Sequence, residues 1–233
     1  MDRFAKVLLR LQESKQLRTV IFGASNTDRY MPGIHWGDIL HLGLRYEYCK
    51  PCWVINSGAN GNNTREALAR FDRDVKSFSP DIVIVTLGGN DCDTRPEKFV
   101  PLQEYRNNLR EIADRIHSVN GIAVFQTYYR MDIAAMEAER ASGFLRNMDI
   151  IREEAENNNW PLVDQMKLFD QLDEDEFRYK YMLNPMHVNE NGNILIGLEL
   201  LRHFKCDISK VHHPERLLPV IQRHKELTAK MKK

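Results

Sequence analysis

One continuous apolar run constrains the fold of this chain more than any other feature. Residues 81–87 read Asp-Ile-Val-Ile-Val-Thr-Leu, and such an uninterrupted run is typical of a central parallel strand that helices cover on both faces. Shorter runs lie at residues 19–22, 53–56, 121–126 and 161–164. Segments with helical spacing separate them, so right-handed crossovers are expected. We predict an α/β fold, a three-layer α/β/α sandwich with a five-stranded parallel sheet.

The segments between these runs predict the helical layers. Residues 1–17 carry apolar side chains at amphipathic helical spacing. Further helices are expected over residues 36–45, from a cap at Thr64, over 102–118, within 133–159, over 189–204 and in the basic tail from Glu215 onward. No internal repeat or linker divides the chain. We predict a single domain over residues 1–233, with a motif-bearing core at about 18–204 and helical extensions at both ends.

Composition argues against several classes of partner. The 233 residues include 33 Lys and Arg and 33 Asp and Glu, so no net charge favours nucleic acid or an anionic membrane surface. No apolar run is long enough for a membrane span, and the amino terminus lacks the apolar core of a signal peptide. A cytoplasmic location is expected. The cysteines are expected to be reduced thiols, while the spacing of Cys49 and Cys52 leaves redox or zinc chemistry open.

Small polar clusters follow three successive strands. They are Gly23-Ala24-Ser25, Asn60-Gly61-Asn62 and Gly88-Gly89-Asn90-Asp91. The carboxyl ends of parallel strands meet at one edge of a sheet, where ligands gather. Ser25 can act there as a nucleophile, and the ordinary alternative is that it caps a helix. Residues 184–187, Asn-Pro-Met-His, precede the final helix and can return an imidazole to the same edge.

Together these segments resemble the sequence blocks of the SGNH (GDSL-like) hydrolases, a superfamily of esterases, lipases, thioesterases and carbohydrate deacetylases. The resemblance covers about residues 18–204 and keeps the order of the motifs. Residues 23–26 keep the serine of the more usual Gly-Asp-Ser, residues 56–62 match the second block, residues 88–91 match the third, and His187 matches the histidine block. The resemblance implies the flavodoxin-like strand order of SGNH hydrolases.

The resemblance also implies a catalytic mechanism. Ser25 would attack an ester carbonyl, while His187 would accept its proton and return it to the leaving alcohol. The backbone N–H groups of Ser25 and Gly61 and the side-chain amide of Asn90 would hold the oxyanion. No metal and no organic cofactor is required.

Other side chains at this edge are predicted to contact the substrate. Asn26 and Asp91 belong to the motifs themselves, and Tyr128 follows the fourth strand. Tyr129 is next in the chain and faces the same edge. Further candidates for lining a pocket at this edge are Tyr30, Met31 and Trp36.

One position departs from the family pattern. Asn184 stands three residues before His187, where the family usually has aspartate. An aspartate fixes the imidazole tautomer and stabilises the imidazolium, whereas an asparagine can accept the Nδ1–H but carries no charge. Three interpretations are open: a natural Ser-His dyad with a neutral orienting residue, a deliberately weakened mutant, or a domain that binds without turnover. Asp91 and Asp164 are candidate substitutes for the carboxylate.

The resemblance predicts a serine esterase that hydrolyses a small acyl ester, with an O-acetyl group on a carbohydrate as the favoured substrate. A lysophospholipase or an acyl thioesterase is the enzymatic alternative. A noncatalytic ligand-binding module that retains the fold is the alternative of another class. The expected partners are a small-molecule acyl ester and, through the terminal helices, a second copy of the chain in a homo-oligomer.

Overall fold

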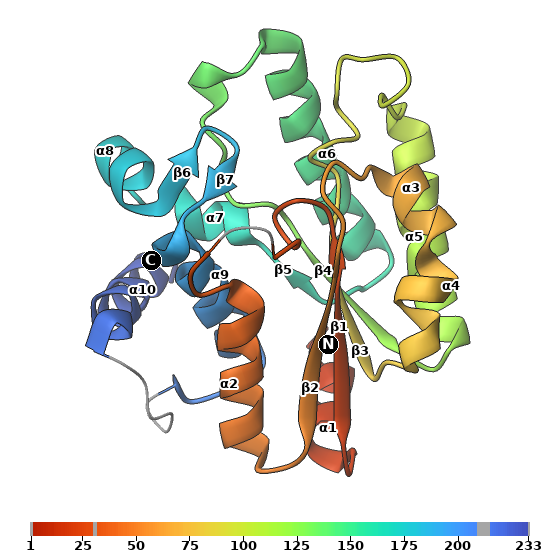
Figure 1. Ribbon diagram of the computed structural model, residues 1–233, viewed down its shortest axis with the longest axis vertical. Coiled ribbons are helices and arrows are strands. Elements are labelled where there is room, and N and C mark those ends of the chain that lie inside the picture. The colour runs from red at the N-terminus through yellow and green to blue at the C-terminus, as the bar shows by residue number, and fades with distance from the viewer. Residues whose placement is uncertain (1, 30–31, 209–214, 233) are drawn as a thin grey trace.

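A five-stranded parallel sheet forms the centre of the protein (Figure 1). The computed structural model describes residues 2–29, 32–208 and 215–232. The strands are β1 (Leu17–Gly23), β2 (Cys52–Gly58), β3 (Ile82–Thr86), β4 (Ile122–Gln126) and β5 (Leu162–Val163). They lie in the order β2-β1-β3-β4-β5, and all neighbours are parallel. This order confirms the predicted α/β fold and its flavodoxin-like sheet.

The connections between the strands are largely helical. Within the described residues the helices are α1 (Ala5–Glu13), α2 (Trp36–Tyr48), α3 (Thr64–Ala69), α4 (Phe71–Asp74), α5 (Leu102–Ser118), α6 (Ala138–Asn157), α7 (Gln165–Phe169), α8 (Glu174–Glu176), α9 (Glu190–His203) and α10 (Leu218–Lys230). Shorter helical turns are η1 (Lys76–Phe78), η2 (Ile133–Ala135), the π-helical turn η3 (Phe177–Tyr181) and η5 (Glu215–Leu217). None of the helices in the described ranges is long and apolar enough to cross a membrane.

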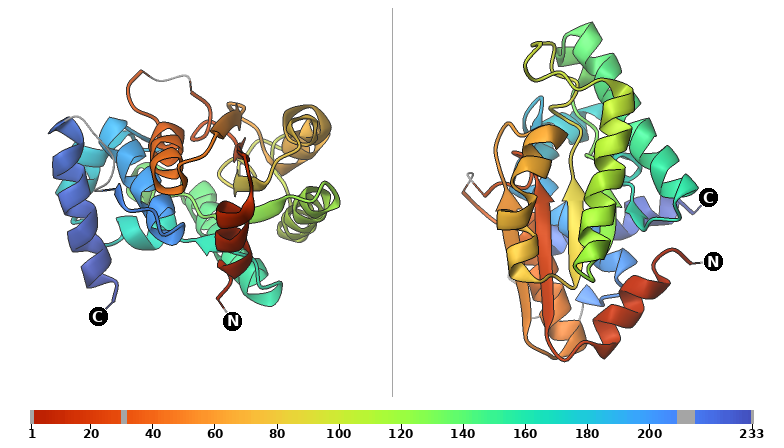
Figure 2. Two further views of the ribbon diagram at one scale, coloured as in Figure 1. Left: turned by 90° about the horizontal axis from the view of Figure 1, so that it is seen from below. Right: turned by 90° about the vertical axis from the view of Figure 1, so that its right-hand side faces the viewer.

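These helices cover both faces of the sheet (Figures 1 and 2). α2 and α9 pack together on one face, while α3, α5 and α6 cover the other, and α10 packs on α9. α1 lies at the amino ends of the strands, where Arg10 bonds with Asp81 and with the carbonyl oxygen of Asn120. Because β3 is covered on both faces, all five of its residues are buried, as its continuous apolar sequence predicts.

The register of the strands brings three loops to one edge. Gly23 at the end of β1 pairs with Gly58 of β2 and with Thr86 of β3. The loops that follow these residues therefore leave the sheet at the same level. They also approach one another closely, because a Cβ atom on Gly58 would lie 2.1 Å from the backbone nitrogen of Asp28. Only a residue without a side chain fits there.

Some elements differ from their predicted form. Asn63, not Thr64, caps α3, because the Asn63 side chain accepts from the N–H of Glu66 and the Glu66 carboxylate accepts from the N–H of Asn63. The segment 133–159, predicted to hold one or two helices, contains the short turn η2 and helix α6. The sequence patterns also miss an antiparallel hairpin of β6 (Met182–Asn184) and β7 (His187–Val188). Its strands are too short to show an alternating pattern.

A buried carboxylate joins the last two helices. Glu199 of α9 is 1% exposed and accepts from Arg202 Nε at 2.9 Å and from His224 Nε2 of α10 at 2.9 Å. Its other oxygen lies 3.3 Å from His203 Nε2. Burial by itself would raise the pKa of Glu199, but the hydrogen bonds from Arg202, His203 and His224 hold it well below its ordinary value. The carboxylate is therefore charged and paired in the folded protein.

We predict that Glu199→Gln lowers the free energy of unfolding at pH 7 by about 2–4 kcal/mol, because it removes the charge that the two helices share. Urea unfolding measures this difference. A carboxylate whose pKa is lowered by folding stabilises above its unfolded pKa of about 4.3, so the difference should shrink as the pH falls below that value. Glu226→Gln on the exposed face of α10 is the control. Equal effects of both substitutions at pH 7 would contradict the prediction.

Candidate active site

Ser25 and His187 meet at the carboxyl edge of the sheet. Ser25 lies on the turn after β1, and His187 is the first residue of β7. The distance between His187 Nε2 and Ser25 Oγ is 3.0 Å, which is within reach of proton transfer. Ser25 does not cap a helix, because α2 begins only at Trp36 with His35 as its N-cap. The turn instead directs the hydroxyl toward the imidazole.

The side-chain oxygen of Asn184 sets the tautomer of this imidazole. Asn184 Oδ1 lies 3.1 Å from His187 Nδ1 and accepts from the backbone N–H groups of Met186 and His187, each at 2.9 Å. Of the two ends of an amide, only the oxygen can accept from N–H donors, so the oxygen faces the ring. Nδ1 then carries the proton, and Nε2 presents its lone pair to Ser25.

The hydroxyl of the buried Tyr129 contacts residues adjacent to both members of the dyad. The Tyr129 hydroxyl lies 2.7 Å from the carbonyl oxygen of Met186 and accepts from the N–H of Val188 at 3.2 Å. It also contacts the side-chain oxygen of Asn26. The first two partners flank the histidine in the chain, and Asn26 follows the serine. The position of Tyr129 after the fourth strand predicts that it lies at this edge, but no local pattern indicates that its hydroxyl links the hairpin to the turn after β1.

The predicted oxyanion residues lie on the adjacent loops. Gly61 occupies a turn closed by a hydrogen bond from the N–H of Asn62 to the carbonyl oxygen of Ala59, and its φ of +75° favours glycine. Asn90 Nδ2 donates to the carbonyl oxygen of Asn62 at 2.9 Å. One of its two hydrogens is used in this way, which leaves the other for a ligand. The loops after β2 and β3 are thus joined at the residues that the resemblance implies.

Arg70 fixes the loop after β2 to the turn after β1. Its guanidinium donates to the carbonyl oxygens of Gly23 and Ser57, each at 2.8 Å, and to Asn62 Oδ1 at 2.6 Å. It also lies over the ring of Phe22. Nothing in the local sequence pattern indicates that the Arg70 side chain would bridge these loops, so this residue was not predicted.

Two predicted substrate contacts need correction because the side chains are buried. Asp91 is fully buried, and its carboxylate accepts from the backbone N–H of Thr64 at 3.0 Å and from the Thr64 hydroxyl. Burial raises the pKa of Asp91 to about 6. Tyr128 is also buried, with 2% of its surface exposed. Asp91 therefore joins the loop after β3 to the start of α3, whereas Asn26 borders a cavity together with Ser25.

The remaining candidates are also placed by the structure, apart from Tyr30 and Met31, which lie outside the described residues. Trp36 is buried, and its indole N–H donates to the carbonyl oxygen of Asn26 at 2.9 Å. Asp164 accepts from Arg152 Nε at 2.8 Å and caps α7. Both candidate substitutes for the family's aspartate, Asp91 and Asp164, are therefore engaged elsewhere.

Two cavities border the dyad. The first has a volume of about 30 Å³ and is bordered by Ser25, His187 and the side chains of Asn26, Ile34 and His35, among others. The second has a volume of about 570 Å³ and is bordered by His187 and Asn184. The first is about the size of one water molecule, and the second falls in the range of ligand pockets.

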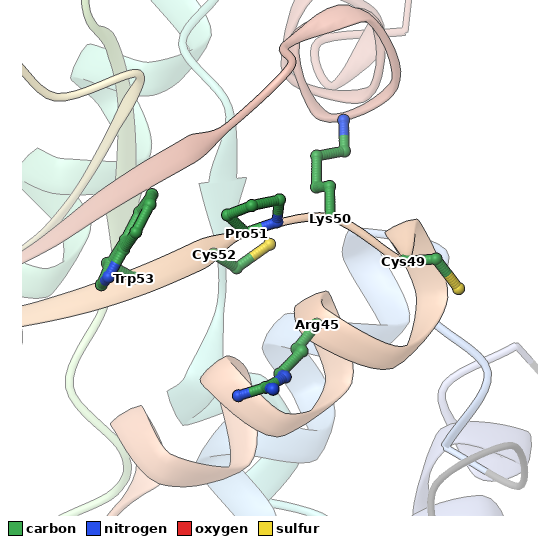
Figure 3. Close-up of a pocket in the computed structure, with 6 residues that line it drawn as sticks. All are labelled: Arg45, Cys49, Lys50, Pro51, Cys52 and Trp53. Atoms are coloured by element: carbon green, nitrogen blue, oxygen red, sulfur yellow. The ribbon is translucent and has the colours of Figure 1, made fainter.

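Cys49 lies at the end of α2, and Cys52 is the first residue of β2. Both residues border a hollow between the end of α2 and the start of β2, where Cys49 is exposed and Cys52 is buried (Figure 3). None of the four cysteines forms a disulfide. Burial raises the pKa of the Cys52 thiol, which is the opposite of what a reactive cysteine requires. Among the described residues, no group of His, Cys, Asp and Glu side chains could hold a metal ion.

The pKa of His187 gives a test of the site's electrostatics. Burial lowers this pKa below its ordinary value, and the amide of Asn184 contributes no negative charge. We predict that Asn184→Asp raises the pKa of His187 by about 1 unit or more, because a carboxylate at hydrogen-bond distance favours the imidazolium. An NMR titration of the ring protons measures the shift. An unchanged pKa would show that the side chain at position 184 does not face the ring in solution.

Comparison with known proteins identifies the family of the chain. Residues 21–194 match the model of the GDSL-like lipase/acylhydrolase family. The chain is 26% identical to an acetylxylan esterase from Geobacillus stearothermophilus over 194 residues, which cover 78% of this chain and 82% of that protein. It is 33% identical to the isoamyl acetate-hydrolyzing esterase 1 homolog of Rattus norvegicus over 110 residues, 44% of this chain and 43% of that protein.

Solved structures show the same fold. The acetylxylan esterase Axe2 from Geobacillus stearothermophilus superposes with a TM-score of 0.73 at 20% identity, covering 88% of this chain and 100% of that one. Catalytic mutants of Axe2 with a serine, an aspartate or a histidine replaced by alanine are among the similar structures. The family match covers most of the sheet and all four motifs, and the resemblance to the SGNH (GDSL-like) hydrolases is confirmed. The chain belongs to the GDSL-like lipase/acylhydrolase family, and its named esterase relatives are carboxylic ester hydrolases.

Proposed function

We propose that this protein is a serine esterase that removes a small acyl group, acetyl in particular, from an oxygen ester. The observation that carries the proposal is the 3.0 Å distance between Ser25 Oγ and His187 Nε2. A hydroxyl and a neutral imidazole at this distance form the nucleophile and base of acyl transfer. The esterase names of the relatives support the same reaction.

The reaction follows from the arrangement of these groups. His187 Nε2 takes the proton of Ser25 as Oγ attacks the carbonyl carbon, and the imidazolium keeps its Nδ1–H bond to Asn184 Oδ1. The imidazolium then protonates the leaving alcohol, and an acyl-enzyme remains on Ser25. Water, deprotonated by the same nitrogen, hydrolyses this intermediate. The oxyanion accepts hydrogen bonds from the N–H groups of Ser25 and Gly61 and from the second hydrogen of Asn90 Nδ2. Each of these donors therefore contributes directly to the reaction rate.

The geometry favours the interpretation of Asn184 as a neutral orienting residue. In a serine protease, replacing the triad aspartate by asparagine costs about four powers of ten in turnover because the wrong tautomer forms. That loss does not apply here, because Asn184 Oδ1 already faces Nδ1. The missing charge still lowers the stability of the imidazolium. Asparagine therefore permits catalysis while keeping the resting imidazole neutral.

The cavity beside Ser25 limits the acyl group. Its volume of about 30 Å³ suits a small acyl group such as acetyl. Acetyl is also the acyl group in the names of both relatives. The cytoplasmic location, the single-domain organisation over residues 1–233 and a homo-oligomer through the terminal helices stay predictions.

Labelling with a fluorophosphonate tests the proposed function. We predict covalent modification of Ser25, mapped by mass spectrometry, and hydrolysis of 4-nitrophenyl acetate faster than of the octanoate. Ser25→Ala should abolish labelling and reduce hydrolysis by about three powers of ten or more. Ser142→Ala, on the exposed face of α6, is the control and should match the unmodified protein. Saturable ligand binding without labelling or turnover would instead identify a noncatalytic module.

The hydrogen bonds of Tyr129 make it a positioning residue for the dyad. We predict that Tyr129→Phe lowers kcat by about 10–100-fold with little change in KM, because a small displacement of a catalytic group is enough for such a loss. Tyr48→Phe is a matched control, because the Tyr48 hydroxyl also donates to the backbone carbonyl oxygen of a residue distant in the sequence, Phe204. Both variants should lose similar thermal stability. Equal kcat values in the two variants would show that Tyr129 has a structural role only.

A further inference from the structure

A buried network of polar side chains adjoins Asn90, the residue whose amide would bind the oxyanion. Its members are Asp91, Thr64 and Asn108, and all three are buried. Asp91 follows Asn90 in the loop after β3. Thr64 is the first residue of α3, and Asn108 belongs to α5, which lies beside α3 (Figure 1). Three segments that are distant in the sequence therefore meet through polar groups next to Asn90.

The hydrogen bonds of this network converge on the carboxylate of Asp91. Asn108 Nδ2 donates to the hydroxyl oxygen of Thr64 at 2.9 Å. Because that oxygen accepts from Asn108, the Thr64 hydroxyl gives its own hydrogen to Asp91 Oδ1, which it contacts. The same carboxylate oxygen accepts from the backbone N–H of Thr64 at 3.0 Å. This N–H lies in the first turn of α3, where the helix itself offers no acceptor.

Stability alone does not account for a carboxylate at this position. Asp91 is fully buried, and its Oδ2 has no hydrogen-bond partner in another described residue. Burial raises the pKa of Asp91 to about 6, so the group is still largely ionised at neutral pH. A buried charge with one unpartnered oxygen stabilises a fold less than an apolar side chain of similar size would. What such a network provides is one fixed geometry for the segments that it joins.

The segment that is fixed in this way carries Asn90. Asn90 Nδ2 donates to the carbonyl oxygen of Asn62 at 2.9 Å, while the next side chain, that of Asp91, binds Thr64 two residues further along the same loop. The backbone carbonyl oxygen of Asp91 also accepts from the N–H of Val100 at 2.9 Å. The backbone next to Asn90 and one hydrogen of its amide are thus both held. The second hydrogen of the planar amide then has a single direction.

We propose that Asp91 is a positioning residue for the oxyanion hole: by binding Thr64, it holds the loop after β3 so that the second hydrogen of Asn90 Nδ2 points at the oxyanion. This inference rests on the proposed function and adds to it a residue that does not touch the substrate. An oxyanion donor is effective only if it is in place before the charge develops. A small displacement of Asn90 therefore lowers the rate without weakening the binding of the uncharged ester.

Two substitutions of unchanged shape test this inference. Asp91→Asn removes the charge, and Thr64→Val removes the hydroxyl but keeps the backbone N–H. We expect each to lower kcat for 4-nitrophenyl acetate by about 10-fold and to change KM by less than about twofold. Thr64→Ser keeps the hydroxyl, and its kcat should stay within about threefold of the unmodified protein. Glu199→Gln, the equivalent change at a buried carboxylate of α9, is the control and should leave kcat unchanged despite its lower stability.

A double-mutant cycle distinguishes positioning from a general loss of structure. If Asp91 acts through Asn90, Asp91→Asn should lower kcat by about 10-fold in the unmodified protein but by less than about twofold in a protein that already carries Asn90→Ala. Equal losses in both backgrounds would overturn the proposal. Unchanged kcat in both Asp91→Asn and Thr64→Val would overturn it as well.

An NMR measurement separates this inference from the proposed function, because it needs no turnover. The side-chain amide signals of Asn90 are assigned by their loss in Asn90→Ala, and the proton bonded to Asn62 should shift in Asp91→Asn as that hydrogen bond weakens. Absence of Ser25-dependent hydrolysis would overturn the proposed function and with it the role of Asn90 as an oxyanion donor. Unchanged Asn90 signals in Asp91→Asn would overturn the positioning by Asp91, whether or not the protein hydrolyses esters.

Discussion

The orientation of one amide determines what the dyad can do. Asn184 Oδ1 accepts two backbone N–H groups from its own hairpin, and the same oxygen faces His187 Nδ1. A flipped amide would place its NH2 group against these two N–H donors. The hairpin itself therefore fixes the tautomer of the histidine. A residue without charge can then replace the usual aspartate in its orienting role, though not in stabilising the imidazolium. In the proposed mechanism, catalysis depends on geometry more than on charge.

Two further side chains, Tyr129 and Arg70, support that geometry. Tyr129 holds both neighbours of the histidine and the residue after the serine. Arg70 holds the turn after β1 against the loop after β2. Neither side chain needs to touch the substrate. Each joins segments that are distant in the chain, and such support keeps catalytic groups within the narrow tolerance that proton transfer requires.

The sequence predicts the sheet, its order and the meeting of Ser25 with His187, because apolar runs and small polar clusters are local signals and parallel strands share an edge. It cannot show which side chains at that edge are buried. Asp91 and Tyr128 carry groups suited to substrate binding, but packing turns them inward. Arg70 likewise gains its contacts from segments far away in the chain. Local sequence patterns show neither the burial of a side chain nor its hydrogen bonds to distant segments.

The neutral amide of Asn184 imposes the tautomer with the proton on Nδ1 of His187. Nitrogen-15 NMR of the histidine ring at neutral pH tests it most directly, since protonated and unprotonated ring nitrogens differ widely in chemical shift. We expect Nδ1 of His187 to resonate as a protonated nitrogen and Nε2 as an unprotonated one. A protonated Nε2 beside an unprotonated Nδ1 would contradict the account.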